Sequence, residues 1–389
     1  MHVHILAVYN GYLQRQAGDP LSPRYYHSAL CHDSFKELDF KDIKQYFKAA
    51  EKISCITPEM KSYFPQTAKG KQRVRHIFST FLLGIYCYDN INNLQDSIKN
   101  FIQHKIWTTE ENSNNLQPLE IRKDFLYLWF LIALYHDMGY PYEDCRRLRK
   151  NNLPQISYIN KMGQPDSYNY PCAAGIPATL AQYAQKYFKT RVKTKKLGKR
   201  RLDHGFAGGT MLYKNLKKLH NTGNETRPIG TNALQFGPHI FNRYNIPCAW
   251  TILCHNIWTA FSGRRKADVY RDCGLEGLIF EENSSPIKFS EHPLLFLLDF
   301  VDTIDPIKRF DHNMCEDIVI SSTDTEMSLA FSCKVDCNAE CNCWSRIRKI
   351  QKISDDLAFL KSPQFETRMS GAQITFSFNN IPSVLNTKQ

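Results

Sequence analysis

The segment at residues 121–141, IRKDFLYLWFLIALYHDMGYP, constrains the fold of this chain more than any other stretch. Its apolar residues continue around all sides of a helix, which predicts a helix buried inside a large core. The apolar run FLYLWFLIALY is only about half of the ~20 residues needed to span a bilayer. Gly139 and Pro141 are typical helix terminators, so the adjacent His136 and Asp137 are predicted where this buried helix ends.

The rest of the chain divides into regions of different pattern. Residues 1–70 are polar and punctuated by proline, and we predict an accessory segment there. Residues 71–310 are predicted to form the main part of a mainly α protein, an all-helical core with an irregular basic insert at residues 142–202. Residues 311–389 alternate in DIVISS, MSLAFSC and QITFSF and contain one helical stretch, CWSRIRKIQKISDDLAFL. This pattern predicts a small α+β C-terminal region.

Charge and cysteine content bear on partners and location. The chain has 50 Lys and Arg against 38 Asp and Glu, a formal charge of +12, which favours anionic partners. The run from Lys189 to Arg201 contains eight basic residues and no acid, and it suits a solvated loop, a targeting-like patch or an arm that attracts nucleic acid or polyphosphate. Thirteen cysteines, an odd number, are typical of reduced thiols in a cytosolic protein. Because the N-terminus lacks the pattern of a signal peptide, we predict a cytoplasmic protein that does not enter a membrane.

Five predicted core helices each carry a residue type that binds metals, placed next to apolar neighbours. These residues are His76, His136, Asp137, His204, His255 and Asp302. Taken singly, a histidine on an apolar helix is more often a hydrogen-bonded core residue, and a His-Asp pair at a helix end is usually a cap. Taken together, separately buried polar groups would each need a partner, whereas one or two divalent cations satisfy all of them. Imidazole and carboxylate ligands suit manganese, iron, nickel or zinc.

The order H…HD…H…H…D resembles the HD superfamily of metal-dependent phosphohydrolases over residues 73–310. HDMGYP is similar to the HDIGYP or HDIGK of many members, and DHGFAGG is similar to the DHG that opens a later helix in a subset of them. PLLFLLDFVDTID looks like the segment that presents the last aspartate. Tyr140 stands where many phosphodiesterase members have a lysine, and the chain lacks the histidine cluster of the HD-GYP group. Membership of that group is therefore not expected.

The resemblance implies an all-helical domain that holds one or two divalent transition-metal ions. The ligands of the first ion would be His76, His136, Asp137 and Asp302. In binuclear members a second ion adds two histidines, which correspond here to His204 and His255, and the HD aspartate bridges both ions. Asp299 lies one helical turn before Asp302 and faces the same way, so it remains an alternative for the last ligand.

The activity that the resemblance implies is hydrolysis of a phosphoester in a nucleotide, a cyclic nucleotide or a nucleic acid by attack of a metal-activated water. His136 and Asp137 would be the catalytic residues, because they would hold the ions. Divalent ions lower the pKa of a bound water and polarise a phosphoryl oxygen. Charge on the phosphoryl oxygens also requires nearby cations. The candidates, each of which is also typical of a solvated surface, are Arg73, Arg75, Arg201, Lys308 and Arg309.

Two other functions fit the same sequence. One branch of the HD superfamily, similar to inositol oxygenase, uses a set of four histidines and two aspartates for diiron oxygen chemistry. A non-catalytic module, with a structural metal and a basic run that binds RNA or DNA, is the alternative from a different class. The partner expected for a hydrolase is a phosphorylated small molecule or a nucleic acid.

Four cysteines crowd into the segment CKVDCNAECNC, and they are Cys333, Cys337, Cys341 and Cys343. Thiols at this density suit a structural zinc ion, although the C-x3-C-x3-C-x-C spacing differs from the paired C-x2-C of ordinary zinc sites. A cysteine-rich turn with reduced thiols is the other interpretation.

Overall fold

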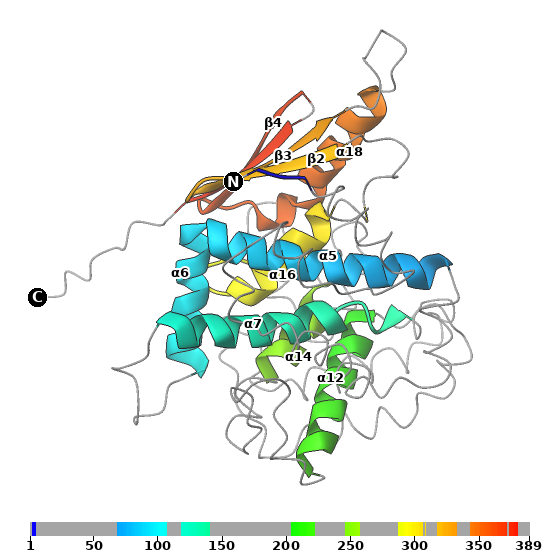
Figure 1. Ribbon diagram of the computed structural model, residues 1–389, viewed down its shortest axis with the longest axis vertical. Coiled ribbons are helices and arrows are strands. Elements are labelled where there is room, and N and C mark those ends of the chain that lie inside the picture. The colour runs from blue at the N-terminus through cyan, green and yellow to red at the C-terminus, as the bar shows by residue number, and fades with distance from the viewer. Residues whose placement is uncertain are drawn as a thin grey trace, which may run out of the picture.

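The computed structural model describes residues 2–4, 68–106, 118–140, 204–221, 246–256, 287–305, 308, 317–332, 343–371 and 373–379. This part of the chain is mostly helical, with one antiparallel sheet (Figure 1). The helices are α5 (Ala68–Asn90), α6 (Asn92–Phe101), α7 (Pro118–Tyr135), α12 (His204–Asn221), α14 (Ile246–Cys254), α16 (Pro293–Ile304) and α18 (Cys343–Asp356), with a π-helical turn η1 (Ile102–Ile106) and a 3-10 turn η7 (Ala358–Leu360). The strands are β1 (His2–His4), β2 (Asp317–Ser322), β3 (Glu326–Ser332), β4 (Phe365–Ser370) and β5 (Gln373–Phe378).

Helices α5 and α7 pack against each other in the middle of the helical part (Figure 1). Large aromatic side chains form this contact. Trp129 is fully buried, and its Nε1 donates a hydrogen bond of 2.9 Å to the carbonyl oxygen of Phe81. Tyr88 stacks on Phe125 with ring centroids 3.9 Å apart. The prediction that the apolar segment before His136 is a buried helix is confirmed.

Helix α12 approaches both α7 and α14 closely because a glycine lies at the crossing. A Cβ built on Gly208 would lie 2.4 Å from the carbonyl oxygen of Tyr135 in α7 and 3.3 Å from the side chain of Ile252 in α14. Only glycine allows the backbones to come this near without a shift. The small residues of the segment HGFAGG therefore bring the first turn of α12 to the ends of two other helices.

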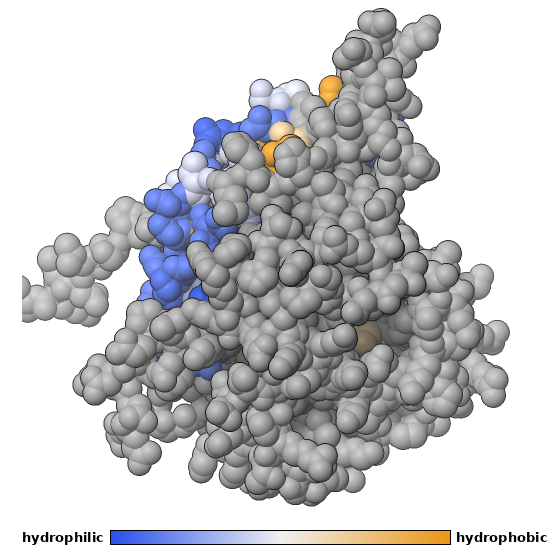
Figure 2. All heavy atoms as spheres, in the orientation of Figure 1, coloured by the Kyte–Doolittle hydropathy of each residue, from blue (hydrophilic) through white to orange (hydrophobic). Residues whose placement is uncertain are grey.

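Helix α6 is amphipathic and closes one side of the helical part. Its apolar side chains Leu94, Ile98 and Phe101 are buried, and the amide of Asn93 donates a hydrogen bond of 2.6 Å to the carbonyl oxygen of Phe378 in β5. Hydrophilic side chains cover its outer face and the neighbouring edge of the sheet (Figure 2). A face of this kind is what a helix at the border of a core presents to water.

The five strands form one antiparallel sheet in the order β1-β2-β3-β5-β4. Side chains that alternate along the strands face the core, such as Ile320 in β2, Leu329 in β3 and Ile374 in β5. Leu329 and Ile374 are direct cross-strand partners, so their side chains lie on the same face. The first residues of the chain join this sheet, because Val3 in β1 pairs with Ile320 in β2.

An aromatic cluster attaches the sheet to α16. Phe300 of α16 lies 5.0 Å from Phe376 and 5.4 Å from Phe378, measured between ring centroids, in edge-to-face arrangements. Phe296, one turn earlier in α16, lies 5.2 Å from Phe365 in the same arrangement. Aromatic pairs of this geometry add to the stabilisation that burial of their surface provides. The sheet and α16 therefore share one core, although the predicted boundary near residue 310 separates them in the sequence.

The pattern-based predictions of strands and helices agree with the described elements. DIVISS, MSLAFSC and QITFSF contain β2, β3 and β5, and α18 lies in the predicted C-terminal helix. Strand β4, FETRMS, was not predicted, because charged or polar residues occupy most of its positions and only Phe365 is fully buried. No helix in the described part of the chain combines the length and the apolar content of a bilayer-spanning segment. The insert at 142–202 and most of residues 1–70 lie outside the described residues.

Candidate metal centre

Six residues from five helical segments gather in the interior as two adjoining groups of possible metal ligands. Within each group, one donor atom from every residue lies within 4.8 Å of the others. The first group is His76, His136 and Asp302, and the second group is Asp137, His204 and His255. All six side chains are buried. They are the six residues for which the sequence predicted a shared metal centre.

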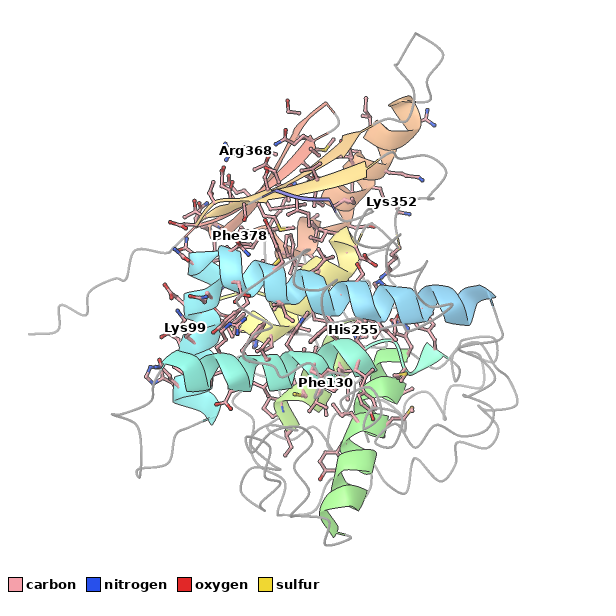
Figure 3. The ribbon with its side chains drawn as sticks, in the orientation of Figure 1. Lys99, Phe130, His255, Lys352, Arg368 and Phe378 are labelled. Atoms are coloured by element: carbon pink, nitrogen blue, oxygen red, sulfur yellow. The ribbon has the colours of Figure 1, made fainter. Side chains whose placement is uncertain are left out.

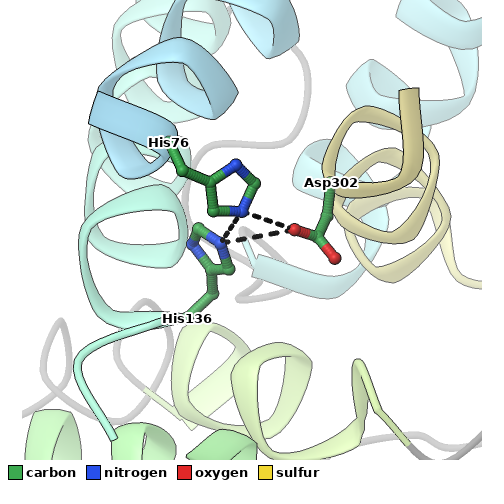
Figure 4. A group of neighbouring side chains, drawn as sticks. All are labelled: His76, His136 and Asp302. Atoms are coloured by element: carbon green, nitrogen blue, oxygen red, sulfur yellow. Dashed lines mark hydrogen bonds and ion pairs between the residues drawn. The ribbon is translucent and has the colours of Figure 1, made fainter. Parts of the chain in front are cut away.

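The first group is held together by short polar contacts (Figure 4). Nε2 of His76 lies 2.6 Å from Oδ1 of Asp302 and 3.2 Å from Nε2 of His136. Nε2 of His136 lies 3.7 Å from the same Asp302 oxygen. Two imidazole nitrogens and one carboxylate oxygen from α5, α16 and the end of α7 therefore point at one another, as ligands of a single ion would.

His136 and His255 occupy equivalent places just after the last residues of α7 and α14. Nδ1 of His136 donates a hydrogen bond of 2.7 Å to the carbonyl oxygen of Ala133, and Nδ1 of His255 donates one of 2.6 Å to that of Ile252. Each ring thus satisfies a carbonyl group at a helix C-terminus. With Nδ1 acting as the donor, the lone pair of a neutral ring is on Nε2. The same histidine can therefore be both the cap of its helix and a metal ligand.

His76 lies between two carboxylates. Its Nε2 contacts Asp302, and its Nδ1 lies 2.5 Å from Oδ2 of Asp305, whose other oxygen accepts a hydrogen bond of 2.6 Å from Ser79. Burial opposes the charged imidazolium, but the nearby carboxylates of Asp137, Asp302 and Asp305 outweigh it and raise the pKa of His76 to about 9. A carboxylate behind a ligand histidine fixes the ring and makes it a stronger donor to a metal.

Asp137 occupies the middle of the six residues. Its Oδ2 lies 3.6 Å from Nε2 of His76, and its Oδ1 lies 3.5 Å from Nε2 of His136 and 3.6 Å from Nε2 of His204. Burial by itself favours the neutral acid, but His136, His76, Arg73 and His204 together lower the pKa of Asp137 far below its usual value. One carboxylate with donors of both groups around it suits the bridging position that the family resemblance implies.

The second group contains a buried nitrogen that needs a partner. His255 lies among the helices in the interior, and its Nε2 has no hydrogen-bond partner among the described residues (Figure 3). Burial and the neighbouring His204 and His136 lower the pKa of His255 to about 3, so the ring is neutral. A neutral, buried imidazole with an unsatisfied lone pair is costly unless something binds it. A divalent cation held with His204 and Asp137 would meet that need.

Two cations border the groups and are partly exposed. Nζ of Lys308 contacts both carboxylate oxygens of Asp302, at 2.7 and 2.6 Å, and the side chain is 31% exposed. Although burial acts in the opposite direction, Lys308 and the two histidines of the first group lower the pKa of Asp302 well below its usual range. Arg73 donates a hydrogen bond of 3.2 Å to Oδ2 of Asp137, and its side chain is 26% exposed. Both cations therefore stand between the buried carboxylates and solvent.

The other predicted phosphate-binding residues have different outcomes. Arg75 lies in α5, but the position of its side chain is outside the described structure, and Arg201 and Arg309 lie outside the described residues altogether. Their predicted role stays a prediction. The same holds for the basic run from Lys189 to Arg201. In the cysteine-rich segment only Cys343, the first residue of α18, falls within a described element.

The choice between two aspartates on α16 has a geometric answer. Asp302 belongs to the first group, whereas Asp299 does not belong to either group. Both carboxylate oxygens of Asp299 are buried without a hydrogen-bond partner among the described residues. Burial and the nearby charge of Asp302 raise the pKa of Asp299 well above its usual value, in spite of Lys308. Burial therefore favours the protonated form of Asp299 beside the site, and Asp302 is the carboxylate that belongs to the first group.

Three residues around the groups were not predicted from the sequence. Asp305 contacts His76 from behind, and Asn256 places its amide 2.9 Å from Nε2 of His204. Tyr140 stacks on the ring of His204, with ring centroids 3.7 Å apart. All three follow a predicted ligand by one to three positions in the chain, so proximity in the sequence was the only available signal.

No family model, no curated protein and no solved structure matches this chain. The interpretation of the site therefore depends on the donor atoms, their distances and their burial.

Proposed function

We propose that this chain is a divalent-metal-dependent phosphohydrolase of the HD type. The observation that carries the proposal is the presence of two adjoining groups of buried histidine and aspartate donors, each bordered by a partly exposed cation. Four imidazoles and two carboxylates, without a thiolate, suit manganese, iron, nickel or zinc. Nε2 of His255, for which the described residues offer no hydrogen-bond partner, and the tautomers of His136 and His255 fit such ions.

When bound, such ions lower the pKa of a water molecule and polarise the phosphoryl group of a substrate. The residues of the chain would contribute in other ways. Asp305 orients His76, and the backbone carbonyl groups of Ala133 and Ile252 orient His136 and His255. Arg73 and Lys308 would lie beside an anionic substrate, because they are the cations between the donor groups and solvent. A nucleotide, a cyclic nucleotide or a nucleic-acid phosphodiester is the substrate class proposed.

The proposal can be tested with bis(p-nitrophenyl) phosphate and added Mn²⁺. The wild-type protein should release nitrophenol, and Asp137→Asn should reduce kcat/KM by roughly 1,000-fold or more because it removes the charge shared by both groups. Asp299→Asn is the matched control, since it makes the same chemical change one helical turn from Asp302. Equal activity of wild type and Asp137→Asn contradicts the proposal, and so does the absence of turnover with this ester and with nucleotide substrates.

The donor sets themselves favour a second candidate, a diiron oxygenase. Each group consists of two imidazoles and one carboxylate, and this combination with open positions is typical of non-haem Fe(II) oxygenases. Oxygen consumption by the ferrous protein in the presence of a polyol, together with no hydrolysis of phosphoesters, would favour this candidate over the first.

A further inference from the structure

Tyr140, the residue at which HDMGYP departs from the lysine of many phosphodiesterase members, lies in a stack of three side chains. Its ring is nearly parallel to the imidazole of His204, with centroids 3.7 Å apart and an angle of 18° between the planes. The guanidinium carbon of Arg73 lies 3.4 Å from the centroid of the Tyr140 ring. Arg73 also donates a hydrogen bond to Asp137. The stack thus begins at one member of the second group, Asp137, and ends at another, His204.

The backbone at the end of α7 brings Tyr140 to this place. The amide of Tyr140 donates a hydrogen bond of 3.1 Å to the carbonyl oxygen of Asp137, which closes a tight turn. Next to it, a Cβ on Gly139 would lie 2.0 Å from the carbonyl oxygen of His204. Any side chain at position 139 would push α12 away. The pair Gly139 and Tyr140 therefore contacts both the backbone and the ring of His204.

The place of His204 in α12 differs from the places of His136 and His255, which follow the ends of their helices. Side chains within a helix lean back over the preceding turn, which restricts their orientation. His204 is the first residue of α12, so no earlier turn of this helix lies under its ring. His136 and His255, by contrast, are each fixed by a hydrogen bond from Nδ1 to a carbonyl group. At His204 the amide of Asn256 contacts Nε2 at 2.9 Å, and the face of the Tyr140 ring restricts the tilt of the imidazole.

We propose that Tyr140 is a positioning residue for the second group, in which its ring, held on the other face by Arg73, fixes the imidazole of His204 for a metal ion. The inference builds on the proposed function, because it concerns the same metal centre. It assigns the role to the aromatic ring and not to the hydroxyl group. It also predicts a selective effect, since Tyr140 stacks on His204 and its amide donates to the carbonyl oxygen of Asp137, and both residues belong to the second group.

The test is calorimetric titration of the metal-free protein with Mn²⁺, which needs no substrate. The variant His255→Ala, which lacks a member of the second group, should lose one of the two binding events. The lost event is then assigned to the ion of the second group. Tyr140→Phe should bind both ions as the wild type does. Tyr140→Ala should bind the first ion normally and the second about 10- to 100-fold more weakly, as expected when a residue that orients a ligand is removed. Tyr140→Leu retains the volume without the flat ring and should behave like the alanine variant.

The outcomes separate this inference from the proposed function. Normal binding of both ions by Tyr140→Ala and Tyr140→Leu overturns the inference and leaves the metal centre standing. Equal weakening of both ions, with a lower melting temperature of the metal-free protein, shows a merely structural role and also overturns it. Failure of Tyr140→Phe to bind the second ion overturns the assignment to the ring. A wild-type protein that binds no Mn²⁺ overturns the proposed function and the inference with it.

Discussion

The two donor groups of the candidate metal centre have the same composition, two histidines and one aspartate, but they differ in how their atoms are satisfied without a metal. In the first group His76 is hydrogen-bonded to Asp302 and Asp305, and Lys308 contacts both oxygens of Asp302. In the second group the buried ring of His255 is neutral, and its Nε2 has no hydrogen-bond partner among the described residues.

This difference shows that two similar ligand sets can differ in what a metal ion must displace when it binds. An ion entering the first group must replace a proton on His76 and a lysine on Asp302, both of which already compensate the buried charge. An ion entering the second group would satisfy Nε2 of His255, which has no hydrogen-bond partner within the described part of the chain. The first group therefore stabilises the metal-free fold, whereas the second group is arranged for binding at some cost to that fold.

The largest effect that tests this comparison is the loss of stability on truncation in the metal-free protein. His76→Ala removes the imidazolium from the buried Asp305 and leaves Asp302 with Lys308 alone, and it should lower the free energy of unfolding by roughly 3–5 kcal/mol. His255→Ala removes a neutral ring with an unsatisfied nitrogen and should cost only about 1 kcal/mol. Urea unfolding in the presence of EDTA measures both values. Equal losses would remove the distinction between the groups.

Metal uptake should depend on pH through His76 in the first group and not through His255 in the second group. The pKa of His76 is raised to about 9, so its ring is protonated at neutral pH and must lose this proton to bind a metal. Affinity should rise about tenfold for each pH unit up to pH 9. The pKa of His255 is lowered to about 3, so its ring needs no deprotonation above that pH. Titration calorimetry in buffers of different ionisation enthalpy counts the released protons, and equal proton release by both ions contradicts the assignment.

Removal of Lys308 should strengthen metal binding by the first group, and this effect should be smaller than the two above. Lys308→Met deletes the cation that competes with a metal for Asp302. Because this lysine is 31% exposed, the ion pair is partly screened, and the first ion should bind only about two- to fivefold more tightly. The second ion should bind as before. Weaker binding of the first ion in this variant would mean that Lys308 supports the metal instead of competing with it.

The smallest change is expected for Asp299→Asn, which should leave the binding of both ions intact. Burial raises the pKa of Asp299, so the folded protein retains a proton that the unfolded chain releases. The stability of the metal-free wild type therefore falls as the pH rises above the unfolded value of about 3.9. Asparagine avoids this loss, so the variant should melt higher than wild type at pH 8 and equally at pH 4. Thermal unfolding in EDTA at the two pH values checks the prediction.

The six candidate ligands could be proposed from the sequence because each lies next to apolar neighbours in a predicted core helix and because their order resembles that of the HD superfamily. Asp302 could be preferred over Asp299 by resemblance, and the grouping in the structure agrees with that preference. The sequence also suggested a helix cap as the alternative role of His136. The structure allows both roles, because one ring nitrogen of His136 caps α7 while the other lies 3.2 Å from Nε2 of His76.

The supporting residues could not be predicted, since their roles depend on contacts between distant segments. Asp305 reaches His76 across 229 positions of the chain, and Asn256 reaches His204 across 52. Nothing in the local pattern distinguishes Asp305 from an ordinary residue after a helix. Strand β4 was missed for a similar reason, because its pairing with β5 and not its own polar sequence makes it a strand.

Metal analysis of the purified protein tests the central claim most directly. After equilibration with Mn²⁺ and removal of the free ion, the wild-type protein and Asp299→Asn should each retain one ion for each donor group. Asp137→Asn should lose the ion of the second group, because Asp137 is the only carboxylate in that group. It should also bind the ion of the first group more weakly. Full retention of metal by Asp137→Asn, or a wild-type protein without bound metal, would contradict the account of a shared metal centre.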